Sequence, residues 1–398
     1  MVEFINRLDD FYEEMVGWRR YLHQHPELSF QEVKTAAFVA EHLRSWGIAV
    51  RTQVGGNGVL GLLEGGHPGP TVALRADMDA LPIQDEKACE YASKVAGVMH
   101  ACGHDAHTST LLGVAKLLSQ HRDSLKGNVV FIFQHAEETT PGGALSMIRD
   151  GALQGVDVVY GVHLWTPFPV GNIYSVDGPM MAAPDEFVIT IKGKGGHGGL
   201  PHETVDSVVV GSHVVVNLQS IVSRQVNPIE PCVVSVGAFQ AGGAFNVIAE
   251  TCTLKGTVRT FNQELRSEVK ERFEHILAAT CSMFGAEYTL EYKMGYPPVV
   301  NHISEVQRYH RVGAELFGKT QVRTSPLIMA GEDFSYYLQK VPGCYMFVGA
   351  GNEAAGVRYP HHHPRFDIDE RAMLLSGKLL IGMAVNFISE WNSRFGKG

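Results

Sequence analysis

Five short polar clusters in this sequence contain residue types that bind metal ions in proteins. They combine one cysteine with several histidines and glutamates, and they read His100-Ala101-Cys102-Gly103-His104-Asp105-Ala106-His107, Gln134-His135-Ala136-Glu137-Glu138, Gly161-Val162-His163-Leu164-Trp165, Lys194-Gly195-Gly196-His197-Gly198-Gly199 and Pro360-His361-His362-His363-Pro364. Thiolate, imidazole and carboxylate together are the ligand set of zinc, manganese, cobalt or nickel. Together the clusters predict a hydrolase that activates water on a pair of metal ions.

Cys102 and His104 are separated by one residue in a turn that contains glycine. The ordinary interpretation of such a pair is a buried thiol beside a solvated histidine. His100 and His107 lie nearby and favour a metal site, and Asp105 could orient a ligand imidazole from behind. A role for Cys102 as a nucleophile stays open as an alternative.

Glu137 and Glu138 directly follow the apolar segment 129–133. Exposed Glu-Glu pairs are common in solvated turns, but this apolar segment should hold the pair near a sheet edge. Adjacent residues leave a strand in opposite directions. One carboxylate could therefore bind metal while the other acts as the general base.

Histidines in the other three clusters have both ordinary and functional interpretations. His163 follows an apolar strand, where hydrogen-bonded core histidines are common. At least one of the three histidines 361–363, held between two prolines, is expected to be a ligand. His197 is flanked by glycines, which permit close approach and movement. It belongs either to a flexible turn or to an oxyanion-binding site.

Length and composition narrow the class of protein. The chain has 398 residues, enough for two domains, and its net charge of −9 argues against a nucleic-acid partner. Its start lacks the features of a signal peptide, and six scattered cysteines do not suggest a disulfide framework. No apolar run is judged long enough to span a membrane. We therefore expect a cytoplasmic protein without membrane partners.

Alternating strand and helix patterns predict an α/β fold with a mixed, mostly parallel central sheet. The expected strands are 48–54, 58–64, 71–78, 129–133, 156–162 and 344–348, and the expected helices are 3–23, 29–46, 107–120, 142–150, 302–317 and 369–391. Ser29 and Glu32 have capping-box spacing at the start of the second helix. Three polar clusters follow strands, so they should meet at one edge of the sheet.

The pattern changes near residue 184. The order becomes strand 186–192, helix 204–223, strands 232–239 and 250–260, helix 263–284 and strand 286–293. This β-α-β-β-α-β order predicts a ferredoxin-like domain over 184–298. It would be inserted into a metal-binding catalytic domain formed by 1–183 and 299–398.

The chain resembles the metal-dependent amidohydrolases that include bacterial N-acyl-amino-acid aminoacylases, hippurate hydrolases and plant auxin-conjugate hydrolases. The resemblance covers nearly the whole chain and rests on the ordered segments 19–28, 74–82, 99–107, 330–334 and 362–366. It implies a zinc-peptidase-like catalytic domain that binds two divalent metal ions. It also implies a smaller lid domain through which the protein forms a homodimer.

The resemblance also implies roles for particular residues. The metal ligands would be Cys102, His104, Glu138, His163 and His362. Glu137 would be the general base, with Asp79 as a supporting carboxylate. His197 would reach the active site of the partner subunit, and Asn246 and Arg259 would hold the substrate's carboxylate. Ser207 and Ala249 stand where relatives commonly have proline, which puts loop rigidity in question there.

The sequence thus predicts a dimeric two-metal amidohydrolase that releases a carboxylic acid and a free amino acid from an N-acyl amino acid. Two alternatives remain. One is a dinuclear metallo-dipeptidase or carboxypeptidase, and the other is a protein that binds metal or ligand without catalysis. The acyl group, the amino-acid preference and the native metal are not determined by the sequence.

Overall fold

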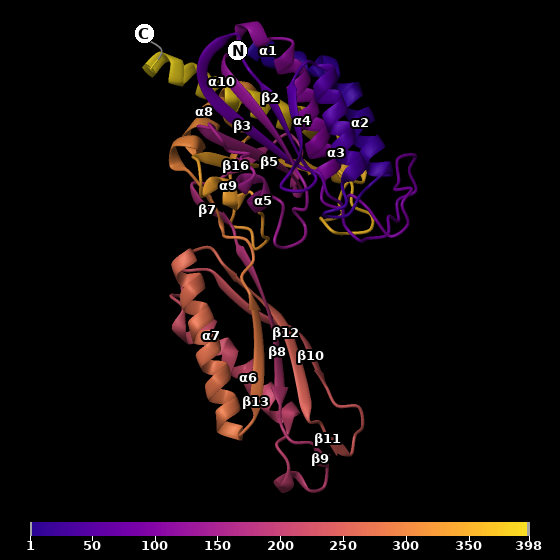
Figure 1. Ribbon diagram of the computed structural model, residues 1–398, viewed down its shortest axis with the longest axis vertical. Helices are drawn as coiled ribbons and strands as arrows, with labels where there is room; N and C mark the ends of the chain where they lie inside the picture. Colours follow the sequence, from indigo (N-terminus) through magenta and orange to yellow (C-terminus); the bar gives the residue numbers. More distant parts are fainter. Residues whose placement is uncertain (1, 396–398) are drawn as a thin grey trace. The chain divides into compact units, whose positions relative to one another are not determined.

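The computed structural model describes residues 2–395, and the chain divides into two compact units. Unit 1 contains the chain up to Gly178, Val300–Pro326 and the chain from Asp333 onward. Unit 2 contains Pro179–Val299 and Leu327–Glu332. Figure 1 shows the elements of both units.

Unit 1 is built on an eight-stranded mixed sheet in the order β1-β2-β4-β3-β5-β16-β6-β15. Its strands are β1 Ala49–Val54, β2 Gly58–Leu63, β3 His67–Asp77, β4 Lys126–Gln134, β5 Val158–Pro169, β6 Ile173–Ser175, β15 Val322–Thr324 and β16 Gly343–Gly351. The four central strands β4, β3, β5 and β16 run parallel. Their apolar side chains are buried, as expected for parallel strands covered on both faces. The predicted mixed sheet with a parallel centre is confirmed.

Helices cover this sheet. They are α1 Val2–Asn6, α2 Tyr12–Gln24, α3 Val33–Ser45, α4 His104–Ser119, α5 Ala144–Arg149, α8 Ile303–Phe317, α9 Ser335–Leu338 and α10 Ala372–Phe395. Helix α4 packs against α2, α10 and β3, which fixes the residues at its start relative to the sheet. The predicted single helix over 3–23 is divided, because a 3₁₀ segment at Arg7–Phe11 separates α1 from α2.

The expected capping box at the start of α3 is wrong. The helix begins at Val33, and Glu32 at the N-cap makes no capping hydrogen bond with its side chain. The Ser29 hydroxyl donates to Asp79 Oδ2 at 2.7 Å, and Glu32 accepts from Ala136 N at 2.7 Å. Both side chains therefore face the loops after β3 and β4 instead of the helix.

Helix α10 contains the segment Ala372–Arg394, which is long and apolar enough to cross a membrane. The expectation that no segment has this character is therefore wrong by length and composition. In the structure, 67% of its most apolar 18-residue stretch is buried inside the protein. The helix packs against α4, α8, β3 and β5, so apolar residues are required on most of its sides.

Unit 2 contains a four-stranded antiparallel sheet in the order β10-β12-β8-β13 (Figure 1). Its main elements are β8 Ala183–Lys192, α6 Ser207–Ser220, β10 Cys232–Ala241, β12 Thr251–Thr260, α7 Gln263–Phe284 and β13 Glu287–Lys293. This is the β-α-β-β-α-β order of a ferredoxin-like unit. A short ladder pairs β9 Gly196–His197 with β11 Val247–Ile248. Strands β7 Gly178–Met181 and β14 Val299–Asn301 lie where the chain passes between the units.

The helices of unit 2 have clear start and stop signals. Asp206 caps α6 by accepting from Val208 N at 2.9 Å, so the helix begins three residues later than expected. Asn262 caps α7, which ends at Gly285 with φ of 70°. The Ser207 hydroxyl donates to Ala249 O at 2.8 Å. This hydrogen bond fixes the start of α6 to the residue that follows β11.

A buried ion pair fastens α7 to the sheet of unit 2. Asp185 on β8 accepts from Arg266 Nε at 3.0 Å, and the two side chains are 1% and 3% exposed. Tyr292 and the Gly295 backbone also donate to this carboxylate. Asp185→Ala should destabilise the protein by about 3–5 kcal/mol, because it leaves a buried guanidinium without its partner. Urea unfolding measures the loss.

The exposed neighbour provides the control for this prediction. Glu186 follows Asp185 on β8 and is exposed. Glu186→Ala should change the free energy of unfolding by no more than about 0.5 kcal/mol. Equal effects of the two substitutions would show that the buried pair does not stabilise unit 2.

Candidate metal centre

The polar clusters of unit 1 meet where β3, β4 and β5 lie side by side. Asp77 is the last residue of β3, and Glu137 and Glu138 follow β4 by a few residues. His163 lies inside β5, which continues to Pro169, instead of ending the strand as expected. The expectation that these clusters share one region of the sheet is met by their contacts, described below.

Cys102 and His104 approach the same region from the start of α4. The helix begins at His104, three residues before the predicted start, and Gly103 before it has φ of 90°. Glycine adopts this left-handed conformation without the steric cost that other residues have. The turn places the thiol and the imidazole on the same side of the sheet edge.

Asp79 connects these loops. Its Oδ2 accepts from Glu138 N at 2.9 Å and from the Ser29 hydroxyl at 2.7 Å, and its Oδ1 lies 3.1 Å from His104 Nδ1. Burial opposes ionisation, but hydrogen bonds from His104, Glu138 and Ser29 hold the pKa of Asp79 below its usual range. An ionised carboxylate only accepts, so His104 Nδ1 carries a proton, and Nε2 is the ring nitrogen that a metal ion could bind.

The donor atoms of Cys102, His104 and Glu138 lie within 4.8 Å of one another. His104 Nε2 is 3.8 Å from Glu138 Oε1, and neither atom has a hydrogen-bond partner among residues 2–395. Buried polar atoms without partners are costly. A divalent cation between these atoms would satisfy both, so the residues present fit a metal ion.

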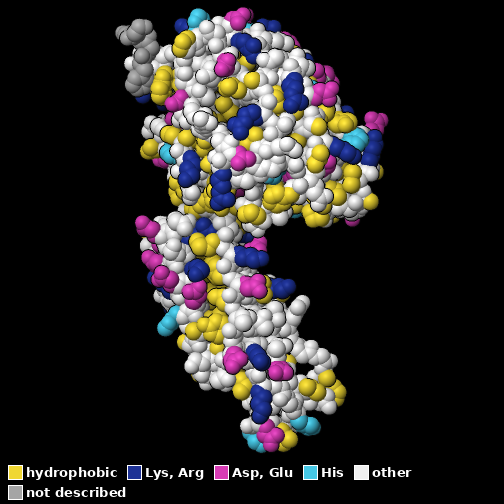
Figure 2. Space-filling view, in the orientation of Figure 1, with side chains coloured by type: hydrophobic (Ala, Val, Ile, Leu, Met, Phe, Trp, Pro, Cys, Tyr) yellow, Lys and Arg dark blue, Asp and Glu magenta, His cyan; other side chains and the backbone are white. Residues whose placement is uncertain are grey.

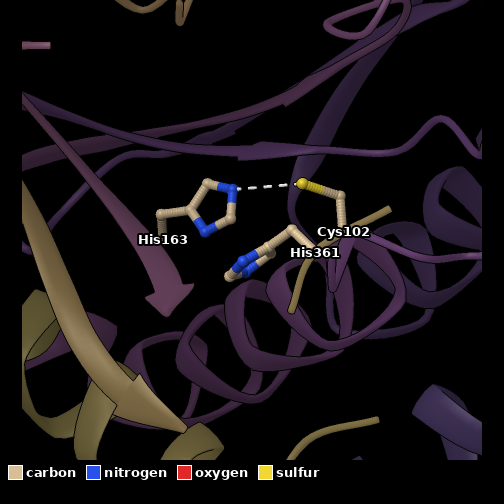
Figure 3. Close-up of side chains that lie close together, drawn as sticks. All are labelled: Cys102, His163 and His361. Atoms are coloured by element: carbon tan, nitrogen blue, oxygen red, sulfur yellow. Dashed lines mark hydrogen bonds between the residues drawn. The ribbon is translucent and has the colours of Figure 1, made fainter. Parts of the chain in front are cut away.

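A second group joins Cys102 to His163 and His361 (Figure 3). The Cys102 sulfur lies 3.5 Å from His163 Nε2, and Figure 3 shows these two side chains pointing toward each other with the ring of His361 beside them. The Leu164 carbonyl is 2.8 Å from His163 Nδ1 and 3.0 Å from His361 Nε2. A carbonyl only accepts, so Nε2 of His163 and Nδ1 of His361 remain available to a metal.

His362, which the resemblance implies as a ligand, lies beside Glu138 and not beside His163. Its Nε2 is 3.4 Å from Glu138 Oε2, and its φ of 65° is left-handed. The backbone of His362 donates to Ala101 O at 2.8 Å, which attaches this loop beside the Cys102 turn. Both His361 and His362 therefore lie at the candidate centre, while sequence reasoning singled out only His362.

A third group, Asp77 with His104 and His107, has metal-ligand types within 4.8 Å but different chemistry. His107 Nδ1 is 2.7 Å from Asp77 Oδ1, and His107 Nε2 accepts from Leu164 N at 2.9 Å. Both ring nitrogens of His107 are occupied. Arg75 also donates to Asp77 Oδ2 at 2.6 Å. The hydrogen bonds of this group connect the end of β3 and the start of α4 to β5. They leave no ring nitrogen of His107 for a metal ion, so the group is not a second metal centre.

Electrostatics at the centre favour a cation. Burial raises the pKa of the Cys102 thiol well above its usual range, and the charges of Glu138 and Glu137 raise it further. Burial alone would lower the pKa of His104, but the carboxylates around it, with Asp77 the strongest, raise it to about 10. Negative charge therefore exceeds positive charge here, and a metal ion would compensate it.

Glu137, the expected general base, is 7% exposed and precedes the expected ligand Glu138 in the chain. The preceding residue, Ala136, has φ of 52°, an uncommon conformation for alanine. Its N–H donates to the buried Glu32 carboxylate, and its carbonyl accepts from Gly143 N at 3.0 Å. The turn that presents the two glutamates is thus fixed at both polar groups of Ala136.

The three functional residues expected in unit 2 are divided between the two ends of its sheet. His197 is exposed and pairs with Val247 in the short β9–β11 ladder, next to Asn246. This ladder lies beyond the end of the sheet where Thr251 pairs with Lys192. Arg259 pairs with Pro184 at the other end. At about 3.3 Å per residue, the eight steps of β12 from Thr251 to Arg259 span roughly 26 Å.

Sequence reasoning missed several residues that build the centre. They are Ser29, Glu32 and the backbone of Leu164. The polar segment after His25-Pro26 was the available signal for Ser29 and Glu32, but helix capping explained it equally well. Contacts made by backbone groups, such as those of Leu164, cannot be predicted from residue type, because every residue has the same carbonyl group.

Comparisons with known proteins identify relatives over the whole chain. The family model of peptidase family M20/M25/M40 matches residues 73–383. An N-acyl-L-amino acid amidohydrolase of Geobacillus stearothermophilus is 53% identical over 301 residues, which are 75% of this chain and 81% of that protein. Thermostable carboxypeptidase 2 of Saccharolobus solfataricus is 39% identical over 393 residues, covering 97% and 99% of the two chains.

A solved structure agrees with the sequence comparison. The YXEP protein of Bacillus subtilis, described as a dinuclear metal-binding peptidase from the M20 family, superposes with a TM-score of 0.83. It is 35% identical and covers 96% of this chain and 99% of its own.

Cys102→Ala should lower metal uptake by the metal-free protein, because the substitution removes a donor atom common to two of the ligand groups. Metal analysis after dialysis against zinc or manganese measures the ions bound per chain. Cys344→Ala is the control, since Cys344 is a completely buried thiol on β16 that contacts Ser175. Equal metal content in both variants would show that Cys102 is an ordinary buried thiol.

Proposed function

The chain belongs to peptidase family M20/M25/M40 and is a hydrolytic enzyme, and from this premise we propose that it hydrolyses the amide bond of N-acyl amino acids. The products would be a carboxylic acid and a free amino acid. The 53% identity to an enzyme named for this substrate class supports the proposal. The observation that carries it is the gathering of Cys102, His104 and Glu138 donor atoms within 4.8 Å, with Glu137 next in the chain.

The proposed metal ligands all come from unit 1. They are Cys102, His104, Glu138, His163 and His362, and they would hold two divalent ions such as zinc, manganese, cobalt or nickel. When bound, such ions polarise a carbonyl and lower the pKa of water. Asp79 holds the Nδ1 side of His104, so that its Nε2 faces Glu138. The Leu164 carbonyl holds the Nδ1 side of His163, so that its Nε2 faces Cys102.

Glu137 would act as the general base. Its carboxylate would take a proton from the attacking water and then donate that proton to the leaving amine. Glu137 is nearly buried, so little bulk water competes for this carboxylate. Glu138, one residue further, would stay ionised as a ligand. The two adjacent carboxylates thereby divide proton transfer and metal binding.

The substrate-binding residues of unit 2 support a homodimer. Asn246 and Arg259 of one chain lie roughly 26 Å or more apart along the sheet, too far for one small carboxylate to contact both. We propose that a complete site takes Arg259 from one chain and His197 with Asn246 from its partner. His197 would donate a hydrogen bond to the oxyanion.

The surface of unit 2 has the apolar character that such an assembly needs. Val208, Val209 and Val216 on α6 are 40%, 43% and 68% exposed. Phe245 and Val247, beside Asn246, are 102% and 55% exposed. Figure 2 shows apolar side chains on the visible surface of this unit. Exposed large apolar side chains are available there to a second copy of the chain.

Arg259→Ala should raise KM for N-acyl amino acids far more than for the matching amides without a carboxylate. A guanidinium binds a carboxylate through two parallel hydrogen bonds, and the loss of a charged hydrogen bond costs about 1.5–3 kcal/mol, roughly 10–150-fold. Steady-state kinetics with acetyl, benzoyl and longer acyl donors measures this difference. Lys255→Ala, at an exposed cation on the same strand, should leave both KM values unchanged.

The same substrate panel tests the function itself. Free dipeptides and C-terminally extended peptides are included, because one relative is named a carboxypeptidase. Faster cleavage of these peptides than of every N-acyl amino acid would replace the proposed activity by a peptidase activity. An equal effect of Arg259→Ala on acids and amides would assign Arg259 a structural role.

Mixing two inactive variants tests the shared site. Glu137→Gln should lose about 10²–10⁴-fold of the rate, since an amide cannot take the proton, and His197→Ala about 10²–10³-fold in kcat. A heterodimer of the two variants contains one site with both residues intact. Activity should then recover to about half the wild-type value per heterodimer, by this count of one intact site in two.

His202→Ala is the control for this experiment, because His202 is an exposed histidine in the same loop. Its activity should equal that of the wild type. Subunit exchange is verified by native mass spectrometry. Confirmed exchange without recovered activity would show that His197 does not act in the partner's site.

A further inference from the structure

A buried carboxylate from the N-terminal segment holds the turn that carries Glu137 and Glu138. Glu32 is 0% exposed. Its Oε1 accepts from Ala136 N at 2.7 Å and from Phe30 N at 3.0 Å, and its Oε2 accepts from Asn57 Nδ2 at 3.1 Å. Although Glu32 stands at the N-cap of α3, its side chain makes no capping hydrogen bond. Its hydrogen bonds therefore join Ala136 in the loop after β4 to Phe30 and Asn57, and none of them caps the helix.

Ala136 is held in a conformation that alanine rarely adopts. Its φ is 52°, in the left-handed region where a Cβ atom is crowded by the backbone. Such conformations persist only where surrounding contacts enforce them, and they concentrate at functional sites. The Glu32 carboxylate supplies that contact at the Ala136 N–H. Gly143 N also donates to the Ala136 carbonyl, and Glu138 N donates to Asp79.

We propose that Glu32 is a positioning residue for the two glutamates of the candidate centre. By keeping Ala136 left-handed, it sets the direction in which the chain presents Glu137 and Glu138. Without the Glu32 carboxylate, Ala136 would relax to a favourable φ and rotate the peptide before Glu137. This inference rests on the proposed function for the roles of the two glutamates, but the restraint on Ala136 is independent of that function.

An isosteric amide cannot replace this carboxylate. Both oxygens of Glu32 accept from N–H donors on opposite sides, Ala136 and Phe30 at Oε1 and Asn57 at Oε2. In Glu32→Gln, one oxygen becomes an NH₂ group. Either the NH₂ faces the Asn57 amide as two opposed donors, or it faces the backbone and both bonds at Oε1 are lost.

The experiment combines Glu32→Gln with Ala136→Gly. Glu32→Gln should lower kcat on the best N-acyl amino acid by about 10–100-fold, the usual effect of removing a residue that orients a ligand. Glycine adopts φ of 52° without steric cost and needs no restraint. The double variant Glu32→Gln/Ala136→Gly should therefore recover part of the lost kcat, which a general loss of stability would not allow.

Glu27→Gln is the matched control. Glu27 is another N-terminal glutamate, and its carboxylate accepts from Lys34 N and Thr35 N at the start of α3. The substitution should lower thermal stability and leave kcat unchanged. A comparable loss of kcat in Glu27→Gln and Glu32→Gln would overturn the proposal, because disturbance of the N-terminal segment alone would explain both.

Hydrogen–deuterium exchange of the metal-free protein gives a readout that does not need activity. In Glu32→Gln, the peptide covering residues 134–143 should exchange faster than in the wild type and in Glu27→Gln. Unchanged exchange together with unchanged kcat would overturn the proposal. If the wild type hydrolyses no N-acyl amino acid, the proposed function fails, and exchange alone decides whether Glu32 restrains the turn.

Asn57→Ala serves if Glu32→Gln does not fold. It removes the donor that holds Oε2, so the Glu32 carboxylate can rotate and its bond to Ala136 weakens. A smaller increase in exchange over 134–143 than in Glu32→Gln is therefore expected. No increase in this variant would overturn the proposal.

Discussion

The arrangement of the candidate centre depends on one buried carboxylate, that of Asp79. It accepts hydrogen bonds from the Glu138 backbone, the Ser29 hydroxyl and His104, so it joins loops that are far apart in the sequence. Because an ionised carboxylate cannot donate, it fixes the proton of His104 on Nδ1 and turns Nε2 toward Glu138. Leu164 acts in the same way on the other side, where its carbonyl directs His163 toward Cys102.

The distribution of charge explains why these residues can stay buried. The buried aspartates around the centre are paired with arginine side chains. Arg75 forms ion pairs with Asp77 and Asp333, and Arg19 forms one with Asp105. Glu138 differs from these aspartates, because its ion pairs among residues 2–395 are with two histidines, His104 and His362. Burial of acidic groups is costly where their negative charge exceeds the positive charge around them. A bound divalent ion would remove this cost, which links the stability of the loops to metal binding.

The sheet of unit 2 is rigid, and this rigidity determines how far apart its proposed substrate-binding residues lie. Its sheet is stiffened by antiparallel pairing along ten residues of β8 and β12 and by the buried pair of Asp185 with Arg266. A stiff sheet keeps its two ends apart, so Arg259 and Asn246 of one chain cannot converge on one small molecule. The same rigidity would let each end serve a different site in the proposed dimer. The exposed apolar residues of α6 and of the loop around Phe245 offer surface for such an assembly.

The sequence by itself determined the fold class and the chemistry of the site. Hydrophobic periodicity located the parallel strands and the β-α-β-β-α-β order, because burial imposes a period on each element. Residue types identified the clusters around Cys102, His104 and Glu138 as candidate metal sites, and the family resemblance selected these three residues as ligands. Only the tertiary structure showed that Ser29 and Glu32 hold the loops after β3 and β4 instead of capping a helix, and that His361 lies beside His163. Local sequence encodes periodicity and propensity, whereas the partner of a hydrogen bond is chosen by which distant segments packing brings together.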